Sequence, residues 1–135
     1  MLLESRKPAI SPETSKDIVL VVEDEVLLRM MLADVLRRAG FQVLEARNAH
    51  EALDLLGHGA ANVKAVISDI RMPGSIDGVG LARTIRSSYP TIKVLLAAGH
   101  MGALHATEHD GFFQKPYDTA KIIGHVRQLL GHPVT

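Results

Sequence analysis

Acidic side chains and one lysine follow three apolar stretches of this sequence, at positions where they can act on a bound ligand. They are Glu23, Asp24, Asp69 and Lys115. A carboxylate at the end of a strand can serve as a nucleophile, as a metal ligand or as both. A lysine ammonium can pair with a carboxylate or with a phosphoryl oxygen. Each residue taken alone also has an ordinary interpretation, as a turn acid, an acid at a helix N-terminus or a solvated lysine.

Alternating strands and helices must position these side chains. Apolar and β-branched runs predict strands at 18–22, 41–46, 63–68, 92–98 and 111–114. Helical spacing of apolar residues predicts helices at 28–39, 49–57, 78–88 and 119–130. The first helix should turn inward an apolar face made of Leu28, Met31, Leu32, Val35, Leu36 and Ala39. The segment 99–110 contains two glycines and three histidines, so we expect any fourth helix there to be short or irregular.

This alternation predicts an α/β fold, a doubly wound parallel sheet with helices on both faces. In the strand order 2-1-3-4-5 the first and third strands are neighbours, and ligands bind at the carboxyl ends of such strands. Asp24 and Asp69 would then face each other across a crevice. Because carboxylates this close repel, a divalent cation would relieve the repulsion, and oxygen ligands with room for water suit Mg²⁺.

The composition is that of one ordinary globular domain, which we place at 17–131. The 135 residues carry 15 basic and 15 acidic side chains, so no net charge favours nucleic acid or an acidic membrane as a partner. Cysteine is absent and no apolar run approaches the length of a membrane span, which fits a cytoplasmic protein. Residues 1–16 carry two prolines and several hydroxyl side chains, and we interpret them as a flexible lead-in.

The stretches around the acids and the lysine resemble the receiver domain of two-component response regulators. The likeness covers about 17–130 and rests on VVEDE at 21–25, SDIRMP at 68–73, DG at 77–78 and QKPY at 114–117. The resemblance implies a flavodoxin-like (βα)5 fold. It also implies that a histidine kinase transfers a phosphoryl group to Asp69.

The resemblance also assigns roles around Asp69. Asp24, Asp69 and the backbone carbonyl of Arg71 would hold Mg²⁺, and Glu23 would reach the ion through water. Lys115 would contact the phosphoryl group. Such a protein is a signalling switch rather than an enzyme, since it catalyses only its own phosphorylation and dephosphorylation.

The residues that read out phosphorylation depart from the family pattern. Phe112 falls where the family keeps a switching aromatic residue, and Arg71 and His100 match positions that tune hydrolysis of the phosphoryl group. The family has Thr or Ser at the end of the fourth strand, whereas this sequence has Ala98. Only sixteen residues separate Ala98 from Lys115, fewer than is usual in the family. We therefore expect an atypical switch and a poorly formed fourth-helix face.

Several other functions compete with this one. A pseudo-receiver, which binds proteins without taking phosphate, is favoured by Ala98 and disfavoured by the complete set of acids. A zinc site could use His105 and His109 with His100 nearby, but no fourth ligand is apparent. A phosphatase of the haloacid dehalogenase type needs a second Asp two positions after the first, where Arg71 stands. A flavin phosphate would be repelled by the acids at 23–25.

The resemblance implies a sensor histidine kinase as partner and either a downstream phosphotransfer protein or an effector as target. We expect no nucleic acid or membrane partner, no output domain after Leu130, and a monomer or a weak dimer.

Overall fold

The computed structural model describes residues 17–59, 61–99 and 109–133. Five strands lie in this part of the chain: β1 (Ile18–Val22), β2 (Gln42–Ala46), β3 (Val63–Asp69), β4 (Lys93–Ala98) and β5 (Gly111–Gln114). Its four helices are α1 (Val26–Arg38), α2 (Ala49–Gly59), α3 (Gly78–Ser88) and α4 (Thr119–Leu130). The predicted bounds agree with these to within one or two residues.

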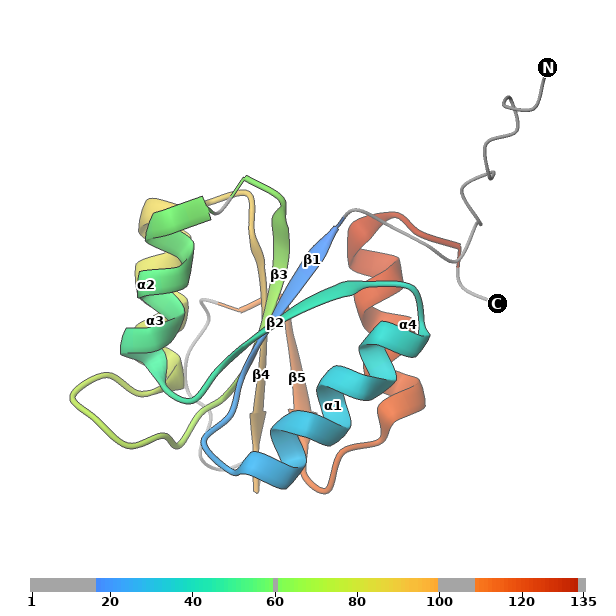
Figure 1. Ribbon diagram of the computed structural model, residues 1–135, viewed down its shortest axis with the longest axis horizontal. Coiled ribbons are helices and arrows are strands. Elements are labelled where there is room, and N and C mark those ends of the chain that lie inside the picture. Colours follow the sequence, from blue (N-terminus) through green and yellow to red (C-terminus); the bar gives the residue numbers. More distant parts are fainter. Residues whose placement is uncertain (1–16, 60, 100–108, 134–135) are drawn as a thin grey trace, which may run out of the picture.

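All five strands are parallel and form one sheet in the order β2-β1-β3-β4-β5, which confirms the predicted doubly wound arrangement. Helices α2 and α3 cover one face of the sheet, and α1 and α4 cover the other (Figure 1). The expected fourth helix of the (βα)5 pattern would fall in 100–108, which lies outside the described residues, as does the lead-in at 1–16.

Each face of the sheet has its own apolar core. Toward α2 and α3 the core includes Leu20, Val66 and Leu96, and toward α1 and α4 it includes Val19, Ile67 and Leu95. Strands β1, β3 and β4 are buried over nearly their whole length because helices pack on both faces of the sheet. Edge strand β2 is only partly buried, as its mixed polarity predicted.

Side-chain caps and glycines set the helix ends. The carboxylate of Asp118 accepts a hydrogen bond from the Lys121 N–H at 3.2 Å and begins α4, as predicted. Asn48 begins α2 in the same way, accepting from the Glu51 N–H at 2.8 Å. Gly40 follows α1 with φ of 101°, a left-handed conformation that favours glycine after a helix.

The predicted inward face of α1 is wrong at its start. Met31 is 37% exposed and Leu28 is only partly buried, whereas Leu32, Ala33 and Leu36 are buried. The helix therefore meets the sheet from its second turn onward, and the first turn lies uncovered beside the carboxyl ends of the strands. None of the helices in the described residues has both the length and the apolar character needed to cross a membrane.

Candidate phosphoacceptor site

The turn after β1 carries Glu23 and Asp24. The Glu23 N–H donates to the Ala46 carbonyl at 3.0 Å, which continues the pairing of β1 with β2 by one residue. Arg29, from the first turns of α1, donates through its guanidinium to the Glu23 carbonyl at 2.9 Å. These bonds fix the backbone, so that the Glu23 side chain is buried while Asp24 is exposed.

Asp69 is the last residue of β3, with 7% of its surface exposed. The chain turns sharply after it: the Ile70 N–H donates to the Ala97 carbonyl at 2.8 Å, and the Gly78 N–H donates to the Ile70 carbonyl at 2.8 Å. A Cβ atom at position 78 would overlap the Asp69 carbonyl, so this close approach requires glycine. The loop that follows Asp69 is thereby held against the end of β3.

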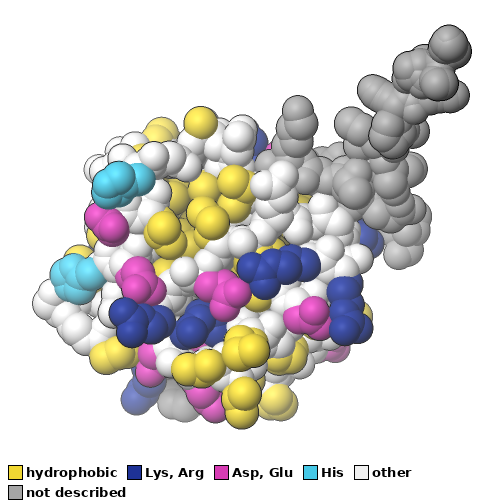
Figure 2. All heavy atoms as spheres, viewed as in Figure 1, with side chains coloured by type: hydrophobic (Ala, Val, Ile, Leu, Met, Phe, Trp, Pro, Cys, Tyr) yellow, Lys and Arg dark blue, Asp and Glu magenta, His cyan; other side chains and the backbone are white. Residues whose placement is uncertain are grey.

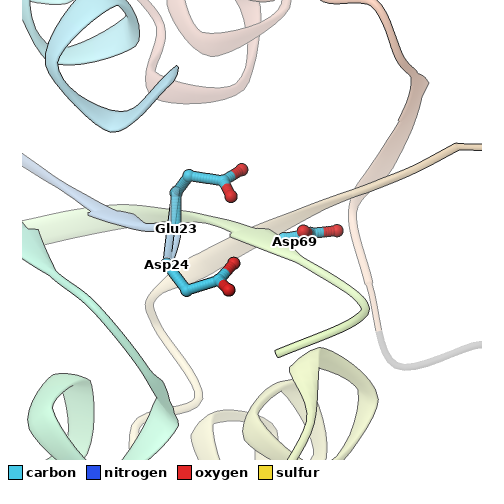
Figure 3. Close-up of side chains that lie close together, drawn as sticks. All are labelled: Glu23, Asp24 and Asp69. Carbon is cyan, nitrogen blue, oxygen red and sulfur yellow. The ribbon is translucent and has the colours of Figure 1, made fainter. Parts of the chain in front are cut away.

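Three carboxylates converge at this edge of the sheet. Glu23, Asp24 and Asp69 each offer one oxygen, and these oxygens all lie within 4.8 Å of one another. Figure 3 shows the three carboxyl groups pointing to the same side, from the ends of β1 and β3. The predicted meeting of Asp24 and Asp69 is therefore found. Closely spaced hard oxygen ligands suit a divalent cation such as Mg²⁺ or Ca²⁺ better than a softer metal.

Lys115 reaches the same carboxylates from the end of β5. Its Nζ atom lies 2.9 Å from Asp69 Oδ2 and 3.2 Å from Glu23 Oε1. The Lys115 N–H donates to the Ala98 carbonyl at 2.8 Å, which anchors the residue beside the end of β4. The peptide bond that follows, to Pro116, is cis. The lysine is thus part of the acidic cluster and not a solvated side chain.

The pKa values of the cluster reflect this burial and pairing. Burial raises the pKa of Glu23 above its usual value, against the opposing effects of the Glu25 N–H and the Lys115 charge. Burial alone would lower the pKa of Lys115, but the hydrogen bond and charge of Asp69, together with Glu23, raise it overall. The ammonium therefore stays charged and stabilises the two buried carboxylates.

Tyr117 also belongs to this cluster, although no sequence pattern predicted it. Its hydroxyl donates to Glu23 Oε1 at 3.0 Å. Burial raises the pKa of the Tyr117 hydroxyl strongly, and the neighbouring Glu23 charge adds to the effect. The signal was present in the motif QKPY, but a bond between residues 94 positions apart cannot be inferred from local spacing.

Of the other residues that the resemblance assigned roles, Ala98, Phe112 and Arg71 lie among the described residues. Ala98 is the last residue of β4 and is 1% exposed. Phe112, on β5, pairs with Leu96 of β4; it is half-buried and packs against the core under α2 and α3. The Arg71 N–H donates to Asp69 Oδ1 at 3.3 Å, and its side chain is exposed. His100 and His105 lie outside the described residues.

The Response regulator receiver domain family model matches residues 19–127. The chain belongs to this family. Its curated relatives include the sensor kinase CckA of Brucella abortus, 33% identical over 83% of this chain and 12% of that protein. The regulator NtrC of Escherichia coli is 30% identical over 87% of this chain and 25% of its own length. The chain therefore spans only a minor part of these relatives.

Solved receiver domains share the fold. The receiver domain of the hybrid histidine kinase CckA is 35% identical, with a TM-score of 0.72 over 84% of this chain and 98% of that one. TrrA of Thermotoga maritima, solved in complex with Mg²⁺ and beryllofluoride, is 29% identical, with a TM-score of 0.76 over 84% of this chain and 98% of that one. This agreement confirms the flavodoxin-like architecture inferred from the sequence.

Proposed function

We propose that this receiver domain accepts a phosphoryl group on Asp69 from a histidine kinase and passes the signal on through protein partners. The observation that supports this proposal is the placement of Asp69 at the end of a central strand. Its Oδ2 atom lies beside the Lys115 ammonium, and two further carboxylates, Glu23 and Asp24, lie within reach. This arrangement would supply a nucleophile, a cation and an acid pair able to bind a metal ion.

The acidic side chains suit Mg²⁺. Asp24, Asp69 and the carbonyl of Arg71 are proposed as direct ligands, and the buried Glu23 would accept a hydrogen bond from a metal-bound water. A bound Mg²⁺ would supply positive charge that offsets the negative charge of the phosphoryl oxygens. The TrrA complex, which holds Mg²⁺ with a phosphoryl analogue, supports this assignment by similarity.

The residues of the site divide the work of transfer. An Oδ atom of Asp69 attacks the phosphorus of a phosphohistidine, so that the new O–P bond forms as the N–P bond breaks and the imidazole leaves. Lys115, which holds the Asp69 carboxylate at 2.9 Å, is placed to pair with a phosphoryl oxygen on that residue. Arg71, and His100 outside the described residues, are proposed to tune hydrolysis from beside the phosphoryl group.

The readout of phosphorylation is proposed to be atypical. Ala98 ends β4 without a hydroxyl, and the loss of one charge-assisted hydrogen bond to a phosphoryl oxygen costs about 1.5–3 kcal/mol. Phe112 is half-buried on the neighbouring strand and lacks the hydroxyl-bearing partner that the family pattern provides. The switch between these two positions is therefore absent or rewired.

An apolar surface beside the site is proposed as the place where the kinase binds. The first turns of α1 expose large hydrophobic side chains, namely Val26 (52%), Leu27 (75%), Met30 (56%) and Met31 (37%). Figure 2 shows hydrophobic side chains gathered at the lower edge, where α1 begins in Figure 1. A pocket lined by Leu28, Met31, Lys115, Pro116 and Tyr117 adjoins this surface at Met31 and the site at Lys115. The phosphohistidine of the kinase must come within bonding distance of Asp69. The kinase must therefore cover the surface around the site, which includes the first turns of α1.

A pseudo-receiver is the second candidate, favoured by Ala98 alone. Titration with beryllofluoride and Mg²⁺, followed by ¹H–¹⁵N NMR, separates the two. A phosphoacceptor should show saturable shifts at Asp69 and Lys115 that require both components. A pseudo-receiver should show no shifts under the same conditions.

We further propose a cytoplasmic location, and an effector or a second phosphotransfer protein as the target.

A further inference from the structure

Tyr117 makes a bond that the proposed transfer does not use. Its hydroxyl donates to Glu23 Oε1 at 3.0 Å, and Glu23 is 1% exposed. The tyrosine lies in the loop between β5 and α4, whereas Glu23 follows β1, so the bond joins the metal-binding turn to the loop that carries Lys115. Its ring centroid also lies 5.6 Å from the Lys115 ammonium.

The two oxygens of the Glu23 carboxylate accept different numbers of hydrogen bonds. Oε2 accepts the Glu25 N–H at 3.2 Å, and Oε1 accepts both Tyr117 and Lys115. Lys115 divides its ammonium between Glu23 and Asp69. Among the described residues, Tyr117 is the side-chain donor to Glu23 that has no bond to Asp69.

Phosphorylation of Asp69 would redistribute these bonds. A phosphoryl group carries more negative charge than the carboxylate oxygen it replaces and attracts the nearby ammonium strongly. As Lys115 turns toward it, Glu23 loses its ammonium donor and keeps the Tyr117 hydroxyl and the metal-bound water proposed above. Loss of a charged donor from a buried carboxylate costs free energy, which opposes the change. A donor that remains on Oε1 reduces that cost.

We propose that Tyr117 is a positioning residue of the phosphoacceptor site, whose hydroxyl holds the Glu23 carboxylate and so allows Lys115 to move to the phosphoryl group. This inference rests on the proposed function. The role proposed for the hydroxyl is separate from packing, because the ring can pack against the core under α1 and α4 with or without the hydroxyl.

Tyr117→Phe tests the proposal because it removes the hydroxyl and keeps the ring. Tyr89→Phe is the matched control, since Tyr89 is the other of the two tyrosines in the chain and lies at the end of α3, before β4. Beryllofluoride binding with Mg²⁺, measured by NMR titration, should weaken about tenfold in Tyr117→Phe, the size expected for a bond to a charged group. The Glu23 carboxyl ¹³C shift should also change, and Tyr89→Phe should match the wild type in both.

Two results would overturn the inference. One is a folded Tyr117→Phe protein that binds beryllofluoride as tightly as the wild type. The other comes from the wild type alone and does not depend on the folding of a variant. The deuterium isotope shift at the Tyr117 Cζ carbon, which marks a hydrogen-bonded hydroxyl, should persist after beryllofluoride and Mg²⁺ are added, and its disappearance contradicts the proposal. A wild type that takes no beryllofluoride would instead refute the proposed function itself, and this inference with it.

Discussion

The ammonium of Lys115 lies 2.9 Å from Asp69 Oδ2, although the two residues are 46 positions apart in the sequence. The parallel sheet makes this contact possible, because the carboxyl ends of β3 and β5 lie on the same edge. The same ammonium also holds Glu23 from the end of β1. One cation thus connects the turns after three strands, and the receiver site depends on that connection.

Removal of one carboxylate should stabilise the Mg²⁺-free protein. The three acids crowd within 4.8 Å and repel one another, so Asp24→Asn should raise the melting temperature by about 2–4 °C. Added Mg²⁺ should stabilise the wild type and should stabilise this variant much less. Thermal melts with and without Mg²⁺ measure both effects. Asp34→Asn, at an exposed acid of α1, is the control and should keep the full Mg²⁺ response. An Asp24→Asn variant with an unchanged Mg²⁺ response would mean that Asp24 is not a ligand.

A restored hydroxyl at Ala98 should couple phosphorylation to Phe112. We expect Ala98→Thr, bound to beryllofluoride and Mg²⁺, to shift NMR signals around Phe112 that do not move in the wild type. Ala98→Val has nearly the same shape without the hydroxyl and controls for crowding at this buried position. Equal spectra for the Thr and Val variants near Phe112 would refute the proposal that the missing hydroxyl makes the switch atypical.

The apolar surface on α1 should matter for a protein donor and not for a small one. Leu27→Asp places a charge on a side chain that is 75% exposed, so folding should be little affected. Transfer from a histidine kinase that phosphorylates the wild type should slow about tenfold or more, because an unpaired charge buried against an apolar partner surface is costly. Labelling by acetyl phosphate should be unchanged. Kinase transfer at the wild-type rate would place the docking surface elsewhere.

The start of α2 should weaken in acid. Glu51 accepts hydrogen bonds from the backbone N–H and the guanidinium of Arg47, and these bonds hold the pKa of Glu51 below its usual value. Its stabilising contribution is therefore complete above the unfolded pKa of 4.5 and is lost as the pH falls through the lower folded pKa. Urea denaturation should show Glu51→Gln less stable than the wild type at pH 7, with the difference closing near pH 3. A difference that stays constant across this range would mean that another group is responsible.

The parts of the site that follow from topology could be predicted from the sequence. Apolar runs placed Asp24, Asp69 and Lys115 at strand ends, and a parallel sheet must bring such ends to one edge. The bond from Tyr117 to Glu23 could not be predicted, because it depends on side-chain rotamers in two loops. The exposure of Met31 was also missed: helical spacing identifies an apolar stripe but not how far along the helix the sheet extends.

The most direct test of the central claim is the intact mass of the protein after incubation with acetyl phosphate and Mg²⁺. We predict that the wild type gains one phosphoryl group, that Asp69→Asn gains none, and that omission of Mg²⁺ abolishes the gain. Asp77→Asn, at the acid that caps α3, should label like the wild type. A wild type that gains no mass, or an Asp69→Asn variant that gains as much as the wild type, would contradict the assignment of Asp69 as the phosphoacceptor.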